Sequence, residues 1–412
     1  MWRRHGDSLY ALLVVVVFTL ELGALAALVW VSSLRLGGLV PRSRLNVILV
    51  GAVIATALAL FGVTVYILGY HAVSAVLERR HTEALSSWTE RWIQTLLYHA
   101  DPPKPPLTLA AEESALALRD LLRGDDGLAL TELLQGYSLD ERLIDRMRSR
   151  RLAPRLDALD QLSRARFRTA FEPLVQAFVE SDAVARLMAG RAIALTLADW
   201  PEGPERDRAC ATFTRALEEA PLPSGAASEV MQLLEDAAPQ ILRALLSSER
   251  QRPELLRAAA DTVGRMGRTE LRGQVGQWIA HPNPEVRSAA LRALSRLGRV
   301  PLNLSEDLLT ALDDQTEFVR VQAAHAAKGL PQKLVLPILY ESMGDRSWWV
   351  RRASAESLLR LGAGGRAALE KAARSHPDRF ARDMSAQVLA DSDTAVEDRR
   401  RPIRARPMEV PA

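Results

Sequence analysis

HPNPEVRSAALRALSRLG (281–298), DDQTEFVRVQAAHAAKGL (313–330) and GDRSWWVRRASAESLLRLG (344–362) are three copies of one pattern in a chain of 412 residues. In each copy a polar turn precedes a Val-Arg pair, and a stretch rich in Ala and Leu follows that pair. Aligned on the arginine, the copies stand 33 and 31 residues apart, at Arg287, Arg320 and Arg351. A repeat of fixed length in this range predicts stacked supersecondary units rather than one compact core.

Each unit is predicted to be a helical hairpin. The first helix ends in the polar turn, and the second helix begins near the Val-Arg pair and ends at a glycine such as Gly298. One hairpin cannot bury its apolar stripe alone, so neighbouring hairpins must stack. In the second helix of one unit, the apolar residues that share a face are Val286, Ala290, Ala293, Leu294 and Leu297.

The array extends in both directions from these copies. HPDRFARDMSAQVLAD (376–391) is a degenerate fourth copy with Arg382, and weaker copies surround Arg257 and Arg186. About seven hairpins are expected between residues 165 and 391. Their first helices are expected to start near residues 171, 205, 237, 269, 303, 332 and 365. The register is least defined in 199–236, where WPEGP and PLPSG loops interrupt the pattern. We therefore predict an all-α chain with an α-solenoid over residues 151–391.

From about residue 150 to residue 391 the pattern resembles the HEAT-repeat superfamily, in particular the short bacterial repeats of phycobilin-lyase-type proteins. The resemblance implies a ladder, within or between repeats, that is formed by the aspartate of the turn and the arginine after valine. The pairs at that spacing are Asp314 with Arg320 and Asp345 with Arg351. His281 and His376 replace the aspartate in two units, which leaves the implied ladder incomplete. One fold hosts many functions, so the resemblance specifies none.

Two N-terminal segments, 9–31 and 46–70, are apolar and long enough to cross a membrane. At ~1.5 Å per residue each forms a helix of roughly 35 Å, longer than the ~30 Å hydrocarbon core of a bilayer. The first segment is too long for the apolar region of a signal peptide and lacks a small-residue cleavage site. Residues 1–70 are therefore predicted to form a transmembrane hairpin.

Glu21 lies near the middle of the first predicted span. A central acid costs roughly 3 kcal/mol on insertion, which the surrounding apolar residues outweigh. Two interpretations stay open. Either a protonated Glu21 bonds to Thr56 or Thr64 of the second span, or Glu21 pairs with a polar or basic group of a partner membrane protein.

Arginines flank the two predicted spans unequally. The side of the termini carries Arg3, Arg4, Arg79, Arg80 and Arg91 close to the bilayer. The connecting loop carries Arg35, Arg42 and Arg44. The positive-inside rule then favours a cytoplasmic solenoid. The preference for Arg over Lys indicates a GC-rich bacterial genome, so we predict a two-pass protein of the bacterial inner (cytoplasmic) membrane.

Residues 71–150 are predicted to form a juxtamembrane helix and a helical adaptor. The second span runs on into an amphipathic helix whose apolar stripe includes Trp88 and Trp92. That stripe is either a packing face or a surface that lies on the membrane. DPPKPP (101–106) ends this helix, because consecutive prolines cannot continue one, and two or three further helices follow.

Residues 392–412 are predicted to be a disordered basic tail. Few apolar residues, three prolines and five arginines from Arg399 onward support this assignment. Anionic lipid is a candidate contact for the tail if the solenoid is cytoplasmic.

The arginines of the second helices have two interpretations. They form the ladder, or they make a basic inner groove that binds an acidic segment of a partner protein. The candidates for partner binding are Arg287, Arg320, Arg351, Arg352 and Arg382.

Trp348 and Trp349 begin a second helix beside Arg351 and Arg352. Adjacent residues cannot both face the same core. One exposed Trp next to these arginines would have the composition of an interface anchor. The alternative is that both pack between repeats.

Composition and motifs argue against an enzyme. The net charge of +3 is not that of a nucleic-acid-binding protein. The single Cys210 excludes an internal disulfide and is predicted to be a small buried hydrophobe. The sequence has no Gly-rich phosphate loop, no His pair with zinc spacing and no nucleophile elbow. No catalytic residue, cofactor or metal is predicted.

These observations favour a membrane-anchored scaffold that binds protein partners through its solenoid groove at the cytoplasmic face. The alternative is an accessory subunit of a membrane enzyme or transport complex, coupled through its spans and Glu21. The layout, with ERWIQTLL (90–97) and RRLAPRLDALDQL (150–162), also resembles bacterial membrane-anchored HEAT-repeat proteins. That resemblance implies a link to glycosyltransferase-dependent polysaccharide systems.

Overall fold

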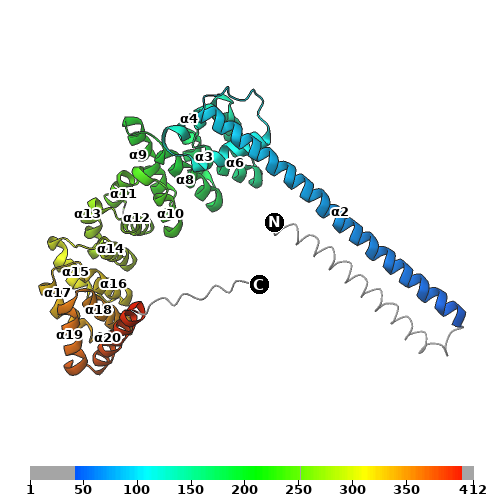
Figure 1. Cartoon of the computed structure of the whole chain (residues 1–412). Coiled ribbons are helices and arrows are strands. Elements are labelled where there is room, and N and C mark those ends of the chain that lie inside the picture. Colours follow the sequence, from blue (N-terminus) through cyan, green and yellow to red (C-terminus); the bar gives the residue numbers. More distant parts are fainter. Residues whose placement is uncertain (1–41, 251, 401–412) are drawn as a thin grey trace. The chain divides into compact units, whose positions relative to one another are not determined.

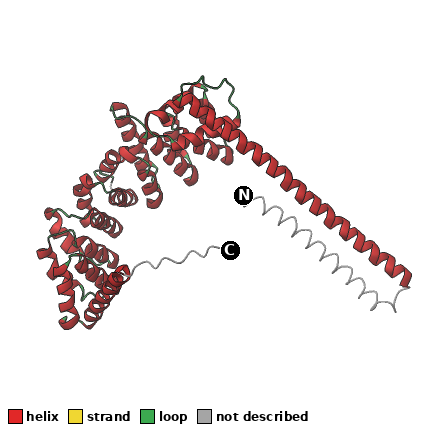
Figure 2. Cartoon of the chain, in the orientation of Figure 1, coloured by secondary structure: helices red, strands yellow, loops and turns green. Residues whose placement is uncertain are grey.

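The computed structural model describes residues 42–250 and 252–400, and within these ranges it contains helices and no strands (Figures 1 and 2). The chain divides into two compact units, with the boundary between Ala115 and Leu116. The predicted all-α fold class is confirmed for the described residues. The first predicted span (9–31), Glu21 and the end of the predicted tail (401–412) lie outside them.

The first unit is dominated by α2 (Arg42–Leu97), a single helix of 56 residues. At ~1.5 Å per residue it is roughly 84 Å long. It contains the second predicted span and continues through the predicted juxtamembrane helix without a break. It ends before the proline-rich segment 101–106, as the sequence predicted.

The end of α2 around Trp92 is a packing face, whereas Val73 and Leu77, earlier in the same apolar stripe, are each 59% exposed. Trp92 is fully buried, and its indole Nε1–H donates to the carbonyl oxygen of Ala111 over 3.0 Å. The hydroxyl groups of Thr89 and Ser114 lie 2.8 Å apart. Both contacts join the end of α2 to the start of α3 (Leu109–Leu121), which spans the boundary between the units.

The middle of α2 is apolar and exposed. Among the described residues it is the one helix long and apolar enough to cross a membrane, with a mean hydropathy of 1.7 over its best 18-residue window, none of which is buried. Exposed side chains in this part include Ile54, Leu58, Phe61, Val65 and Leu68. The two-span hairpin itself stays a prediction.

The second unit contains seven helical hairpins preceded by α4 (Gly124–Gly136), α5 (Leu139–Met147) and α6 (Leu152–Ala165). The first helices are α7 (Phe171–Glu180), α9 (Pro204–Glu219), α11 (Ala238–Leu246), α13 (Arg272–Gly276), α15 (Ser305–Ala311), α17 (Gln332–Ser342) and α19 (Ala363–Ser375). The second helices are α8 (Ala183–Ala198), α10 (Ser224–Gln232), α12 (Pro253–Met266), α14 (Pro284–Leu297), α16 (Glu317–Ala327), α18 (Trp348–Arg360) and α20 (Arg379–Arg400). Short 3-10 helices adjoin the first helices: η1 (Arg168–Ala170), η2 (Glu235–Ala237), η3 (Thr269–Leu271), η4 (Gln277–Ala280) and η5 (Leu302–Leu304).

The hairpins stack in two layers. Each second helix from α8 to α18 packs on the next second helix, and together these helices form the inner layer of the second unit in Figure 1. Every first helix starts within three residues of its predicted position. The predicted apolar face of α14 is buried as expected, from Val286 to Leu297. Cys210 is buried too.

Small residues let the second helices approach closely. Gly264 of α12 faces α14, and a Cβ atom at this position would lie 2.8 Å from the Cα of Ala293. No real Cβ tolerates that distance from a backbone atom. The alanine-rich composition of the second helices has the same consequence at less crowded positions.

Two boundaries differ from the prediction. The stack begins upstream of residue 151, because α5 packs on α6 and α6 packs on α8 as a further hairpin. At the other end α20 continues to Arg400, across residues 392–400 that were predicted to be disordered. This stretch has no proline before Pro402, and Asp393 accepts a hydrogen bond of 2.9 Å from Arg366 of α19.

Candidate partner-binding surface

Arg287 defines the geometry of the arginine ladder. Its Nη1 donates to the carbonyl oxygens of His281 and Pro282, at 2.8 and 3.0 Å, in its own turn. Its Nε and Nη2 donate to the two carboxylate oxygens of Asp314, at 2.7 and 2.9 Å. One guanidinium therefore holds its own turn with one edge and the next repeat with the other.

Arg320 repeats this arrangement one unit later. Its Nη1 donates to the Asp314 carbonyl oxygen over 2.8 Å, and its Nε and Nη2 donate to the carboxylate of Asp345, at 2.8 and 3.1 Å. The ladder implied by the family resemblance exists in its inter-repeat form, whereas the named pairs Asp314 with Arg320 and Asp345 with Arg351 are not formed between side chains. Each aspartate pairs with the arginine of the preceding repeat, because the guanidinium edge that faces its own turn is occupied by backbone carbonyls.

His281 and His376 take over the capping role of the aspartate but not its charge. Asp345 Oδ1 accepts from the backbone N–H of Ser347 over 2.7 Å. His281 and His376 accept through Nδ1 from the N–H two residues on, at 3.0 and 3.1 Å. The turn keeps its shape. Arg351, in the repeat before His376, has no carboxylate partner among the described residues, whereas Arg257, in the repeat before His281, pairs with Glu285 at 3.3 Å.

Arg351 is where the ladder stops. Its Nη1 donates to the carbonyl oxygen of Asp345 over 2.8 Å, as in the earlier repeats. The next turn offers His376, so no carboxylate within the described ranges pairs with Arg351, and its buried Nε has no hydrogen-bond partner. The ring of Phe380 covers the guanidinium at 5.2 Å.

Arg382 belongs to the last repeat and likewise has no carboxylate partner among the described residues. Its Nη1 donates to the carbonyl oxygen of His376 over 2.6 Å, and no ion pair joins it to any described carboxylate. Arg352 differs, because its Nε donates to Glu356 over 2.8 Å.

Trp348 and Trp349 are both exposed, at 41% and 61%. The expectation that at least one packs between repeats is wrong, because the next residue, Val350, occupies the core-facing position with no exposed area. The two rings meet edge to face at 4.7 Å, and Arg352 lies over Trp348 at 5.6 Å.

Phe318 and Phe380 extend this patch and were not singled out from the sequence. They stand two residues before Arg320 and Arg382, and Trp349 stands two residues before Arg351. Their exposed fractions are 40% and 61%. The signal was present in the aligned copies, where three successive repeats carry an aromatic residue at one position. We call Phe318, Trp349 and Phe380 the aromatic row.

The basic groove contains less free charge than its sequence suggested. Arg287 and Arg320 are paired, and Arg292 donates to Asp261 over 2.8 Å. Of the five arginine candidates, Arg351 and Arg382 alone keep an unpaired guanidinium edge. Glu21 cannot be placed, because it lies outside the described residues.

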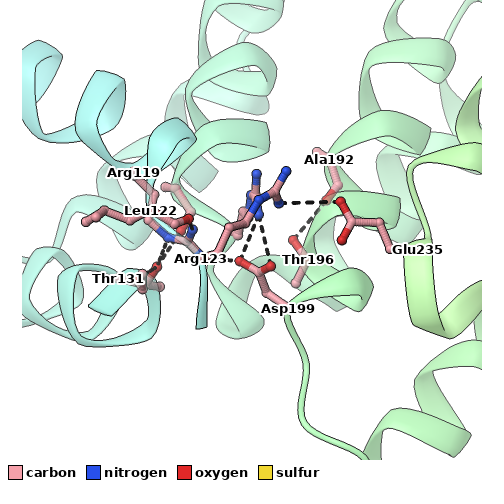
Figure 3. A network of polar contacts seen from close by, with 11 residues as sticks. Arg119, Leu122, Arg123, Thr131, Ala192, Thr196, Asp199 and Glu235 are labelled. Carbon is pink, nitrogen blue, oxygen red and sulfur yellow. Dashed lines mark hydrogen bonds and ion pairs between the residues drawn. The ribbon is translucent and has the colours of Figure 1, made fainter. Parts of the chain in front are cut away.

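A second polar cluster lies at the other end of the second unit (Figure 3). Asp199, the C-cap of α8, forms ion pairs with Arg119 of α3 and with Arg166 at the end of α6, and the Arg166 contacts are both 2.9 Å. Arg119 Nε also donates to Thr131 of α4 over 2.7 Å. We call Arg119, Asp199 and Arg166 the arginine clasp.

The arginine clasp buries more positive than negative charge. The side chains of Arg119 and Arg166 are 1% and 3% exposed, and one carboxylate serves both. Burial lowers the pKa of Arg119, and the hydrogen bond and charge of Asp199 oppose that shift. The clasp therefore joins three helix ends and is a structural element rather than a binding site.

Two other kinds of site concern the described residues: a surface depression and a metal-binding cluster. An open depression of about 610 Å³ lies between α17 and α19, lined by Tyr340, Lys371 and His376 among others. Within the described residues, no three His, Cys, Asp or Glu side chains are grouped so that they could hold a metal ion.

Comparisons with known proteins address the repeats. A family model described as HEAT repeats matches residues 238–317 and 305–390. No curated protein matches the chain. Similar solved structures include an engineered protein, with 17% identity over 76% of this chain and 92% of that chain and a TM-score of 0.36. A designed armadillo repeat protein in complex with peptide (KR)4 has 16% identity over 60% of this chain and 97% of that chain, with a TM-score of 0.26. Human deoxyhypusine hydroxylase in complex with glycerol has 17% identity over 66% of this chain and 100% of that chain, with a TM-score of 0.26. No conclusion about this chain's function rests on these three likenesses.

Proposed function

We propose that this HEAT-repeat protein is a membrane-anchored scaffold, which α2 holds in a bacterial inner membrane and whose stacked second helices bind a protein partner on the cytoplasmic side. The observation that carries the anchor is the apolar part of α2, whose best 18-residue window contains no buried residue. The observation that supports partner binding is the HEAT-repeat stack itself, because such repeats build extended surfaces from nearest-neighbour contacts alone.

Exposed apolar side chains around α2 are the physical argument for a bilayer. Leu58, Val63 and Leu68 are 65%, 55% and 40% exposed, and at 3.6 residues per turn they lie on different faces of the helix. A packing partner of ordinary size covers one face of a helix, whereas lipid covers all of them. A stretch of about 20 apolar residues matches the thickness of the hydrocarbon core.

The basic flanks support the orientation. Arg79, Arg80 and Arg91 follow the apolar part of α2, on the side that leads to the repeats. Positive residues next to a span are retained on the cytoplasmic side. The repeats would then face the cytoplasm.

Cysteine accessibility tests anchor and orientation together. Cys210 provides a silent background, because it is buried and burial raises the pKa of its thiol to about 11. Leu58→Cys, Tyr98→Cys and Leu302→Cys each place one thiol at an exposed position, in the apolar part of α2, after α2 and in the repeats. The reagent is a membrane-impermeant maleimide, applied to spheroplasts and to opened membranes.

The expected pattern is specific. The thiol at position 58 stays unlabelled in both preparations, while those at 98 and 302 react only after the membrane is opened. Labelling at 98 and 302 in intact spheroplasts would reverse the orientation. Labelling at 58 together with recovery of the chain in the soluble fraction would refute the anchor.

A further inference from the structure

The start of helices α18 and α20 exposes three aromatic rings on one surface. Trp348, Trp349 and Phe380 are 41%, 61% and 61% exposed. The two tryptophan rings meet edge to face at 4.7 Å, and Phe380 of α20 covers the guanidinium of Arg351 of α18, so the rings belong to adjacent, packed helices. Single exposed apolar side chains are ordinary, whereas a cluster of large ones marks a surface that another molecule covers.

Two exposed arginines border these rings. Arg346 stands two residues before Trp348, and no ion pair joins it to a carboxylate of the described residues. Arg379 stands directly before Phe380, its side chain is 81% exposed, and its described carboxylate neighbour, Asp383, lies 3.9 Å away at the surface. We call these side chains the Trp-Arg patch: Arg346, Trp348, Trp349, Arg379 and Phe380.

The sign of the charge changes along the stack at this patch. Over the nine residues that end at the aligned arginine, 343–351 contains two arginines and one aspartate, and 374–382 contains three arginines and one aspartate. The aspartate of 343–351, Asp345, is already paired with Arg320. The equivalent residues 312–320 contain three acids and one arginine, and 279–287 contain one of each. Excess positive charge therefore coincides with exposed aromatic rings on the last two repeats.

We propose that the Trp-Arg patch docks on the anionic headgroups of the bilayer that holds α2, as a second membrane contact at the C-terminal end of the repeats. This inference rests on the proposed anchor and orientation, because the cytoplasmic leaflet is the anionic one. Tryptophan rings prefer the headgroup level of a bilayer, and each arginine near an anionic surface is attracted to it. The three rings do not line the depression between α17 and α19, so they present an exposed surface rather than a pocket for a peptide.

The lengths of the elements permit this contact. Beyond the predicted span, α2 continues from residue 71 to Leu97, which is roughly 40 Å at ~1.5 Å per residue. The second helices from α8 to α20 pack in series, and six steps of about 8–10 Å cover roughly 48–60 Å. The stack is thus longer than this part of α2, so its last repeats can reach the bilayer surface. A tethered surface also meets its membrane at a high effective concentration.

A fluorescent label in the patch tests this contact in the full-length chain. Phe380→Cys is labelled with the environment-sensitive dye nitrobenzoxadiazole, while the buried Cys210 stays unlabelled. The chain is reconstituted in vesicles of phosphatidylcholine, alone or with about 30% phosphatidylserine, and a spin-labelled lipid quenches dyes that lie in the bilayer. In the anionic vesicles we expect blue-shifted, quenched emission. Two arginines at an anionic surface should make the ratio of docked to undocked chains about thirtyfold higher than in neutral vesicles, and high salt should remove this difference.

Variants at exposed positions separate the patch from the fold. In the labelled chain, Trp348→Ala with Trp349→Ala should reduce the ratio of docked to undocked chains at least about tenfold, because it removes the rings that enter the headgroup layer. Arg346→Gln with Arg379→Gln should lower the ratio about thirtyfold in anionic vesicles and leave it unchanged in neutral ones. A dye at Leu302→Cys is the positional control, because Leu302 follows the end of α14 and is 65% exposed, and its emission should stay unshifted and unquenched. All variants should keep the circular dichroism and melting temperature of the parent chain.

Four results would overturn the proposal: unshifted emission in both kinds of vesicle, equal docking in neutral and anionic vesicles, a docked ratio of the double tryptophan variant within threefold of the parent, or equal quenching of the dye at position 302. Unshifted emission in both kinds of vesicle would leave the patch to a protein partner. Failure of the anchor is seen separately, because the chain would then be recovered in the soluble fraction in the cysteine-labelling experiment.

Discussion

Removal of the carboxylate of the arginine clasp is the sharpest test of the fold. Asp199→Asn keeps the shape of the side chain and one acceptor oxygen but removes the negative charge between Arg119 and Arg166. Both arginine side chains are at most 3% exposed, so solvent cannot replace the lost partner. Breaking a buried ion pair in this way costs about 3–5 kcal/mol.

This free-energy cost should appear as more frequent local unfolding of the helices joined by the clasp. At about 1.4 kcal/mol per factor of ten, the open population of the helices joined by the clasp should rise by a factor of about one hundred to a few thousand. Repeats contact only their neighbours, so the effect should be confined to α3, α4, α6 and α8. Helices α16 and α18 should keep their parent stability.

Hydrogen exchange with mass spectrometry measures this segment by segment. The matched control is Asp157→Asn, which removes the partner of Arg146 from an ion pair whose two side chains are about half exposed, and which should cost at most about 1 kcal/mol. Adding Arg119→Met to Asp199→Asn removes one unpaired cation and should restore part of the protection. If the α4 and α8 amides of Asp199→Asn exchange within threefold of those of Asp157→Asn, the clasp does not stabilise this end of the unit.

Three further outcomes are expected. Burial opposes ionisation of Asp314, but the hydrogen bonds from Arg287 and Thr316 outweigh burial and lower the pKa of Asp314. The stability that the ionised Asp314 contributes is therefore present above the unfolded pKa of ~3.9 and is lost as pH falls through the lower folded pKa. Between pH 7 and pH 2, the melting temperature of Asp314→Asn should fall less steeply below pH ~4 than that of the parent chain. Gly264→Ala should lower the free energy of unfolding by about 1–3 kcal/mol, because the added methyl group overpacks against α14. Gly273→Ala, which has open space at its Cβ, should leave the free energy of unfolding unchanged. Denaturant titrations measure both. Cys210, with a thiol pKa raised by burial to about 11, should react with an aqueous thiol reagent at pH 7.5 only after denaturation, and labelling of the native chain at the rate of a free thiol would contradict its burial.

Local pattern was sufficient to predict the helical hairpins. A period of 31 to 33 residues, polar turns before Val-Arg pairs and glycines at helix ends are properties of neighbouring residues, and they located every first helix within three residues. The end of α2 was predicted only approximately: the helix stops at Leu97, where His99 takes a left-handed conformation, before the prolines of 101–106. Hairpin stacking followed from the fact that one hairpin cannot bury its apolar stripe.

Contacts between repeats were decided by the tertiary structure. The guanidinium of Arg320 chooses Asp345 of the next repeat rather than Asp314 of its own, because its other edge is taken by turn carbonyls. Arg119 and Asp199 lie 80 residues apart and meet only because α3, α6 and α8 end at one place. The repeat period of the sequence does not predict an ion pair between residues so far apart in the chain.

The candidate partner-binding surface depends both on the repeat pattern of the sequence and on the packing between repeats. Its aromatic positions follow from the aligned copies, where Phe318, Trp349 and Phe380 share one register. Which arginines remain unpaired depends on how each repeat packs on the next: Arg287 and Arg320 meet an aspartate of the following repeat, whereas the guanidinium of Arg351 is covered by the ring of Phe380. The sequence by itself therefore determined the repeating units and their residue types, while the tertiary structure alone decided which arginines are paired, because a charge is paired or unpaired through distances in space and not through spacing along the chain.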